Sequence, residues 1–275
     1  MNRLKIDKQK QVVAALVEGN SIRATCRMTD VAKGTVLKLL ADIGKACAEY
    51  QNEVMKDLPC KRIQCDEIWS FCYAKEKNVP DNKKGKFGYG DVYTFTALCA
   101  DTKIVPSWLI GRRDLPIAMV FMRDLASRLK HRVQLTTDGH RMYLDAVERA
   151  FGIDVDYSQL IKLYGKEAIE KEVRYSPPQC IGAKKEKING NPDPKGISTS
   201  YVERQNLTMR MSMRRFTRLT NAFSKKIENL EYAVALHFMH YNFCRIHQSL
   251  RVTPAMAAGV TDRLWEIEDI ILLLN

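Results

Sequence analysis

Ile63-Gln64-Cys65-Asp66-Glu67-Ile68-Trp69-Ser70-Phe71 is the stretch of sequence that decides the fold. Its apolar residues and its length are typical of a buried strand, yet two adjacent carboxylates lie at its centre. A buried carboxylate without a partner is costly, so an acid on this strand must meet a cation. Side chains alternate along a strand, so Asp66 and Glu67 should face opposite ways, and we take Asp66 as the functional acid.

Two later acids complete a candidate metal site. Asp138 follows the predicted strand 133–137 in Leu135-Thr136-Thr137-Asp138-Gly139-His140, and Glu203 lies in Ser200-Tyr201-Val202-Glu203-Arg204-Gln205-Asn206. Carboxyl ends of strands are where α/β sheets bind ligands. Magnesium is a hard cation that prefers oxygen ligands. We therefore predict a magnesium site made of Asp66, Asp138 and Glu203.

Composition indicates a polyanionic partner. The 275 residues contain 44 Lys plus Arg against 32 Asp plus Glu, a net charge of +12, and nucleic acid is the leading candidate. No apolar run approaches the ~20 residues of a membrane span, and the first residues do not resemble a signal peptide, so we expect a soluble, cytoplasmic protein without a membrane partner. The eight cysteines contain no Cys-x-x-Cys pair, which favours reduced, mostly buried thiols over zinc ligands or disulfides.

The N-terminal region has the spacing of a helix-turn-helix. Helices are predicted over 9–18, 22–28 and 32–43, with Ser21 as a cap and Asp30 at the tight turn. The outer face of the third helix would then carry residues that meet DNA, namely Lys33, Gly34 and Lys38. A plain three-helix packing unit with solvated lysines is the alternative. Residues 46–61 are interpreted as a helical linker.

Beyond the linker the periodicity changes to that of strands. A hairpin over 92–110, a helix from Asp114 to about Leu129, the strand 133–137, a helix over 143–151 and a strand over 155–163 give an α/β order with a mixed sheet. Residues 165–200 are rich in Pro, Asn, Gly and Lys and are predicted to be a flexible insertion, either solvated or holding DNA. Residues 259–275 are predicted to be a helical tail.

The predicted helix 200–213 has one face suited to a phosphodiester. A carboxylate, an amide and two arginines share that face, and further cations follow it: Glu203, Asn206, Arg210, Arg214, Arg218 and Lys225. Such a density of cations favours phosphate binding. The alternative is an ordinary surface helix with a charge pair.

Three blocks carry a resemblance to a known family. Cys65-Asp66-Glu67-Ile68-Trp69-Ser70, Thr137-Asp138-Gly139-His140-Arg141-Met142-Tyr143 and Val202-Glu203-Arg204-Gln205-Asn206-Leu207-Thr208-Met209-Arg210 resemble the conserved blocks of DDE transposases of the first-described bacterial insertion-sequence family. The stretch Arg218–Lys225 and the tail Tyr241–Leu250 followed by Thr253-Pro254-Ala255 are similar to that family too. The resemblance runs from about residue 60 to 258.

The resemblance implies a ribonuclease-H-like catalytic domain over 59–258, here preceded by the helix-turn-helix region and linker of 1–58. It implies that Asp66, Asp138 and Glu203 are the catalytic metal ligands of two Mg²⁺ ions, with Mn²⁺ as a substitute. It further implies binding of terminal inverted repeats and target DNA, and a homo-oligomer on the DNA ends. Three alternatives stay open: a nuclease or junction resolvase of the same fold, a DNA-binding regulator, and an inactive transposase relic.

Overall fold

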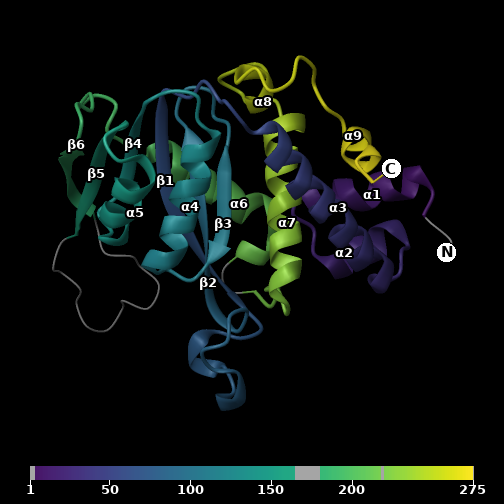
Figure 1. Cartoon of the computed structure of the whole chain (residues 1–275). Helices are drawn as coiled ribbons and strands as arrows, with labels where there is room; N and C mark the ends of the chain where they lie inside the picture. Colours follow the sequence, from purple (N-terminus) through teal and green to yellow (C-terminus); the bar gives the residue numbers. More distant parts are fainter. Residues whose placement is uncertain (1–3, 165–179, 218–219, 275) are drawn as a thin grey trace.

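The computed structural model of the chain describes residues 4–164, 180–217 and 220–274 (Figure 1). Within these residues six strands form one sheet: β1 (Arg62–Cys72), β2 (Gly90–Cys99), β3 (Ser107–Gly111), β4 (Val133–Asp138), β5 (Val155–Tyr164) and β6 (Cys180–Asn189). The α-helices of the same residues are α1 (Ile6–Val17), α2 (Ile22–Thr29), α3 (Lys33–Val54), α4 (Leu115–Arg128), α5 (Met142–Phe151), α6 (Ser200–Ser212), α7 (Ile227–Met239), α8 (Pro254–Ala257) and α9 (Ile267–Leu272).

The sheet has the order β3-β2-β1-β4-β5-β6. The pairs β1–β2, β2–β3 and β5–β6 are antiparallel, whereas β1–β4 and β4–β5 are parallel, which confirms the predicted mixed α/β sheet. In the parallel pair, Gln64 lies opposite Thr136. Two residues further along each strand, Asp66 and Asp138 therefore become neighbours.

Helices cover both faces of the sheet. Helices α4 and α5 lie on one face, where the rings of Phe95 and Phe121 are 5.6 Å apart, and α6 and α7 lie on the other (Figure 1). Between β1 and α6, the side chains of Ile68 and Val202 are fully buried in one apolar cluster. Asp114 caps α4 as predicted, since its side chain accepts the amide hydrogen of Ile117.

The first two helices follow the predicted pattern, and the third is longer than predicted. Ser21 caps α2, and Asp30 has φ of +53° at the turn. The predicted end of the third helix at residue 43 is wrong, because α3 continues to Val54 through most of the predicted linker. Gly44 lies in this longer helix, where it allows close packing. A Cβ there would lie 2.5 Å from Cα of Tyr232, so the absence of a side chain lets α3 lie directly against α7.

The predicted flexible insertion contains a strand. Residues 180–189 form β6, which pairs with β5 at the edge of the sheet, and residues 165–179 lie outside the described residues. Most side chains of β6 are exposed and none is buried, so its sequence lacks the alternation of apolar and polar residues that predicts a strand. Its lysines protect an exposed edge from pairing with another chain.

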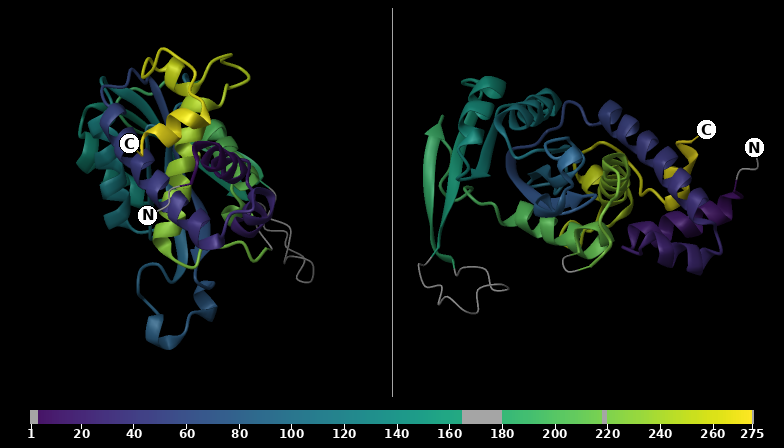
Figure 2. Two further views of the ribbon diagram at one scale, coloured as in Figure 1. Left: turned by 90° about the vertical axis from the view of Figure 1, so that its right-hand side faces the viewer. Right: turned by 90° about the horizontal axis from the view of Figure 1, so that it is seen from below.

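The C-terminal residues return to the N-terminal helices. Helix α9 forms part of the predicted helical tail and lies beside α1, where Lys10 and Glu268 form an ion pair (Figure 2). All eight cysteines are free, and five of them are buried, in agreement with the prediction of reduced thiols. In the part of the chain that the structure describes, no helix combines the length and the apolar character that crossing a membrane requires.

Candidate active site

Three carboxylates converge where β1 and β4 lie side by side. Asp66, Glu67 and Asp138 each place an oxygen within 4.8 Å of the others. Asp66 faces α6 and Glu67 faces the opposite side of the sheet, as alternation predicts, yet both carboxylates reach the end of β4. The structure therefore adds Glu67 to the cluster beside the predicted Asp66.

Helix α6 is fixed over this cluster by two side-chain contacts. Gln64 Oε1 accepts the amide hydrogens of Tyr201 and Val202, at 2.9 and 3.2 Å, which satisfies free donors in the first turn of α6. Asn206 Nδ2 donates to Asp66 Oδ2 at 2.8 Å. The side-chain amide of Gln64 thus holds the start of α6, and that of Asn206 holds the middle of the helix against Asp66.

Glu203 lies near the cluster without joining its tight oxygen group. Its Oε2 is 2.6 Å from Lys162 Nζ, and it also accepts a hydrogen bond from Thr199. Its negative charge is close enough to raise the pKa of Asp66. The structure therefore brings the three predicted acids into one region, with Glu67 as a fourth.

Two cationic side chains form ion pairs with the acids of the site, and neither was predicted from the sequence. Arg113 Nη2 lies 3.3 Å from both Glu67 Oε2 and Asp138 Oδ2, and Lys162 pairs with Glu203. Buried acids require some cation, which the sequence did indicate. Neither cation stands in a recognisable motif, so only the folded chain identifies them.

Burial sets the protonation of the site. The pKa of Asp66 is raised to about 6 and that of Glu67 to about 7, mainly by desolvation. The charge of Asp138 contributes to both shifts, while Arg113 partly opposes the shift at Glu67. Near neutral pH Glu67 is therefore partly protonated, and a bound cation would displace that proton.

The residues present fit a hard divalent cation. Asn206 Oδ1 is buried and has no hydrogen-bond partner among the described residues, and the buried carboxyl of Glu67 lies beside the Tyr143 hydroxyl. An orphaned acceptor beside three converging carboxylates offers only oxygen ligands, the donor set that Mg²⁺ and Mn²⁺ prefer.

The chain matches no protein-family model, and a comparison with curated proteins gives no match. The case for a function therefore depends on this geometry and on the resemblance of the sequence blocks.

The predicted DNA-binding residues fall into two groups. Lys33, Gly34 and Lys38 are exposed on α3 as predicted, and Lys38 forms an ion pair with Asp42. Asn206 and the half-buried Arg210 lie on α6.

The prediction that Arg214 continues the face of α6 is wrong. The helix ends at Ser212, and Met213 has an extended backbone, so Arg214 begins a separate short turn, Arg214–Phe216. Arg218 lies outside the described residues. Arg214 and Lys225 instead share a groove with Lys33.

Proposed function

We propose that this protein is a metal-dependent enzyme that cleaves phosphodiester bonds at the ends of a mobile DNA element and joins those ends to target DNA, as DDE transposases do. The observation that carries the proposal is the convergence of Asp66, Glu67 and Asp138 at neighbouring parallel strands, facing a helix that bears Glu203. The resemblance of the three sequence blocks supports it.

The arrangement of the sheet is consistent with the ribonuclease-H-like fold that the resemblance implies. Strands β1, β2 and β3 form antiparallel pairs, and β4 and β5 extend the sheet beside β1 and run parallel to it. Helices cover both faces. The left-handed turn at Asp30 between α2 and α3 favours a helix-turn-helix, with α3 as the element that enters the major groove.

Each residue of the site has a proposed role. Asp66, Asp138 and Glu203, with Glu67 added, would hold two divalent cations. When bound, such ions supply an activated water or 3′ hydroxyl and stabilise the leaving oxygen. Asn206 orients Asp66. Arg113 and Lys162 would lie against the non-bridging oxygens of the scissile phosphate.

The test is a strand-transfer assay with labelled DNA carrying the sequences that flank this gene. We expect Mg²⁺- or Mn²⁺-dependent cleavage and joining by the wild type, and a loss of at least about 100-fold in Asp138→Asn and Glu203→Gln, because each removes an anionic ligand. Both variants should still bind the ends in a mobility-shift assay. Glu148→Gln, an exposed position on α5, is the control with the same chemical change.

Other results would select another function. Hydrolysis without joining indicates a nuclease or resolvase. Binding of DNA without metal-dependent cleavage by the wild type indicates a regulator or an inactive relic. A complex that contains two or more copies of the chain on paired ends would support the proposed homo-oligomer.

A further inference from the structure

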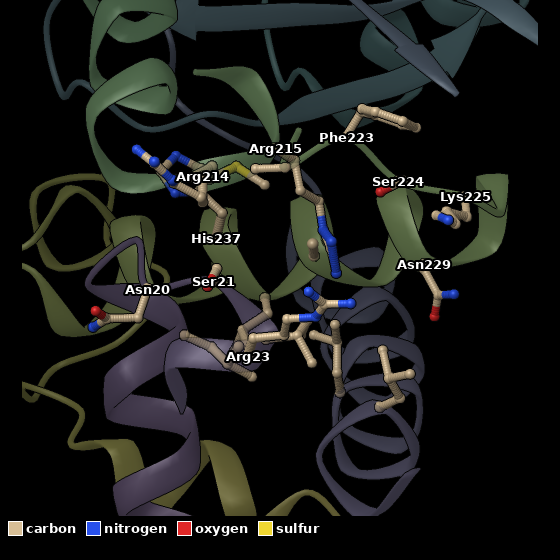
Figure 3. Close-up of a pocket in the computed structure, with 18 of the residues that line it drawn as sticks. Asn20, Ser21, Arg23, Arg214, Arg215, Phe223, Ser224, Lys225, Asn229 and His237 are labelled. Atoms are coloured by element: carbon tan, nitrogen blue, oxygen red, sulfur yellow. The ribbon is translucent and has the colours of Figure 1, made fainter. Parts of the chain in front are cut away.

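A basic groove lies between the N-terminal helices and the segment that joins α6 to α7. It has a volume of about 720 Å³, and α2 and α3 form one wall while residues 212–215, residues 220–225 and α7 form the other (Figure 3). No acid is among its described lining residues. Five cations line it, namely Arg23, Lys33, Arg214, Arg215 and Lys225. This groove is separate from the acidic cluster.

The cations of the groove have no counterions in the part of the chain that the structure describes. None of the five forms an ion pair with an acid of the described residues, in contrast to Lys38 on the same helix α3. Arg23 and Arg215 extend toward each other from opposite walls (Figure 3). Burial lowers the pKa of Arg215 to about 10, which reflects the cost of holding its charge without a partner. An anion between the two guanidinium groups would relieve that cost.

Two buried polar atoms in the groove also lack partners. Ser224 Oγ and His237 Nε2 make no hydrogen bond to any described residue, although Ser224 and His237 are only 3 % and 6 % exposed. Burial lowers the pKa of His237 to about 3, so its ring is neutral and acts as a hydrogen-bonding group. Both residues line the groove, where an oxygen-rich ligand would satisfy them.

The shape and lining of the groove select the ligand. A volume of 720 Å³ corresponds to a cube about 9 Å on a side. The two grooves of B-DNA are together roughly 16 Å deep, so a duplex is wider than this and does not fit inside. Phe223 also lines the groove, and one side of its ring packs against Phe71, with 4.7 Å between the ring centroids. Cations along a backbone path with an aromatic ring for base stacking are the features of single-strand binding sites.

Helix α6 connects the groove to the acidic cluster. Asn206 contacts Asp66, and Ser212, six residues later, lines the groove, a separation of about 9 Å along the helix axis. A single DNA strand carries one charge per about 3.4 Å, so about three nucleotides cover that distance. We propose that the groove binds the phosphodiester backbone of a single DNA strand a few nucleotides from the acidic cluster. The link to that cluster rests on the proposed function, whereas strand binding itself does not.

The test is fluorescence anisotropy of a labelled ten-nucleotide oligothymidine with the full chain in EDTA. The double variant Arg23→Gln/Arg215→Gln should bind at least about ten-fold more weakly, and its plot of log K against log salt should be shallower by about 1.4, because two phosphate contacts are lost. Phe223→Leu should weaken binding about ten-fold and leave the salt slope unchanged. The matched control is Arg123→Gln/Arg149→Gln, which removes two exposed charges from α4 and α5 and should stay within two-fold of the wild type.

Three results would overturn the proposal. The first is that the control variant loses as much affinity for the oligonucleotide as the groove variant does. The second is that the groove variant loses as much affinity for duplex DNA as for the oligonucleotide. The third is that low-millimolar inorganic phosphate displaces the oligonucleotide, which would indicate a small-anion site. Circular dichroism verifies that each variant is folded. Because the assay contains no metal, failure of strand transfer and failure of strand binding are separate outcomes.

Discussion

At Glu67, burial and charge oppose each other. Its side chain is 1 % exposed, and its pKa is raised from 4.5 to about 7. Between these two values the folded protein binds more protons than the unfolded chain, so the free energy of unfolding falls as the pH rises through this range. Without metal, the ionised Glu67 is therefore a source of instability at pH 8, which is the expected cost of assembling acids for a cation.

Glu67→Gln removes that cost. In EDTA at pH 8 the variant should gain up to about 3 kcal/mol in free energy of unfolding, measured by urea denaturation, whereas at pH 4 the gain should nearly vanish because the carboxyl is then protonated in both states. Glu148→Gln, on the exposed surface of α5, should change stability by less than about 0.5 kcal/mol at either pH. A gain that is equal at both pH values would contradict the assignment to ionisation.

Residues of the site differ in how far the sequence could predict them. The strand pattern around Asp66 and the position of Asp138 after a strand were sufficient to bring those acids together. Glu67 was set aside in favour of Asp66 because alternation gives the side of the sheet from which a side chain leaves and not where a flexible carboxylate ends. Arg113 comes from a loop whose path depends on the whole sheet, so its contact has no local signal.

Among the elements, the contact between α3 and α7 depends on one glycine. A Cβ at Gly44 would lie 2.5 Å from Tyr232, whereas at Gly34 on the same helix no atom lies within 4 Å. Gly44→Ala should lower the free energy of unfolding by about 1–3 kcal/mol because the helices must separate. Gly34→Ala should raise it by up to about 1 kcal/mol, since alanine favours the helix and meets nothing. Urea titrations followed by circular dichroism compare the two, and a neutral Gly44→Ala would show that the helices pack less closely.

Elements with a buried side were predictable, and those without one were not. Strands β1, β2, β4 and β5 and helices α4 to α6 each have an apolar face, and each was predicted near its observed limits. Strand β6 is held by backbone pairing with β5, which leaves no trace in hydrophobicity. The second half of α3 was predicted to be helical but was interpreted as a separate linker, because its contact surface includes Gly44 and Gln51 instead of a continuous apolar stripe.

At the scale of the whole molecule, the N-terminal helices and the sheet share one apolar core. A single cluster contains Val13 of α1, Ile43 of α3, Phe95 of β2 and Met239 of α7. Helix α3 is also tied to α7 by the hydrogen bond from Gln51 Nε2 to the carbonyl of Ala235. Helix α3, which carries the exposed Lys33, is thus packed onto the same body that holds the acids.

A shared core predicts one cooperative unfolding transition for the full chain. Scanning calorimetry should give a van't Hoff enthalpy equal to the calorimetric one, as for a single cooperative unit. Removing residues 1–58 would expose the face of α7 that α3 covers, so the fragment 59–275 should lose its sharp transition and bind a dye for exposed apolar surface. Two transitions in the full chain, the upper one retained in a well-packed fragment, would instead establish the N-terminal helices as an independent domain. The outcome decides whether α3 can move relative to the acidic cluster when DNA is bound.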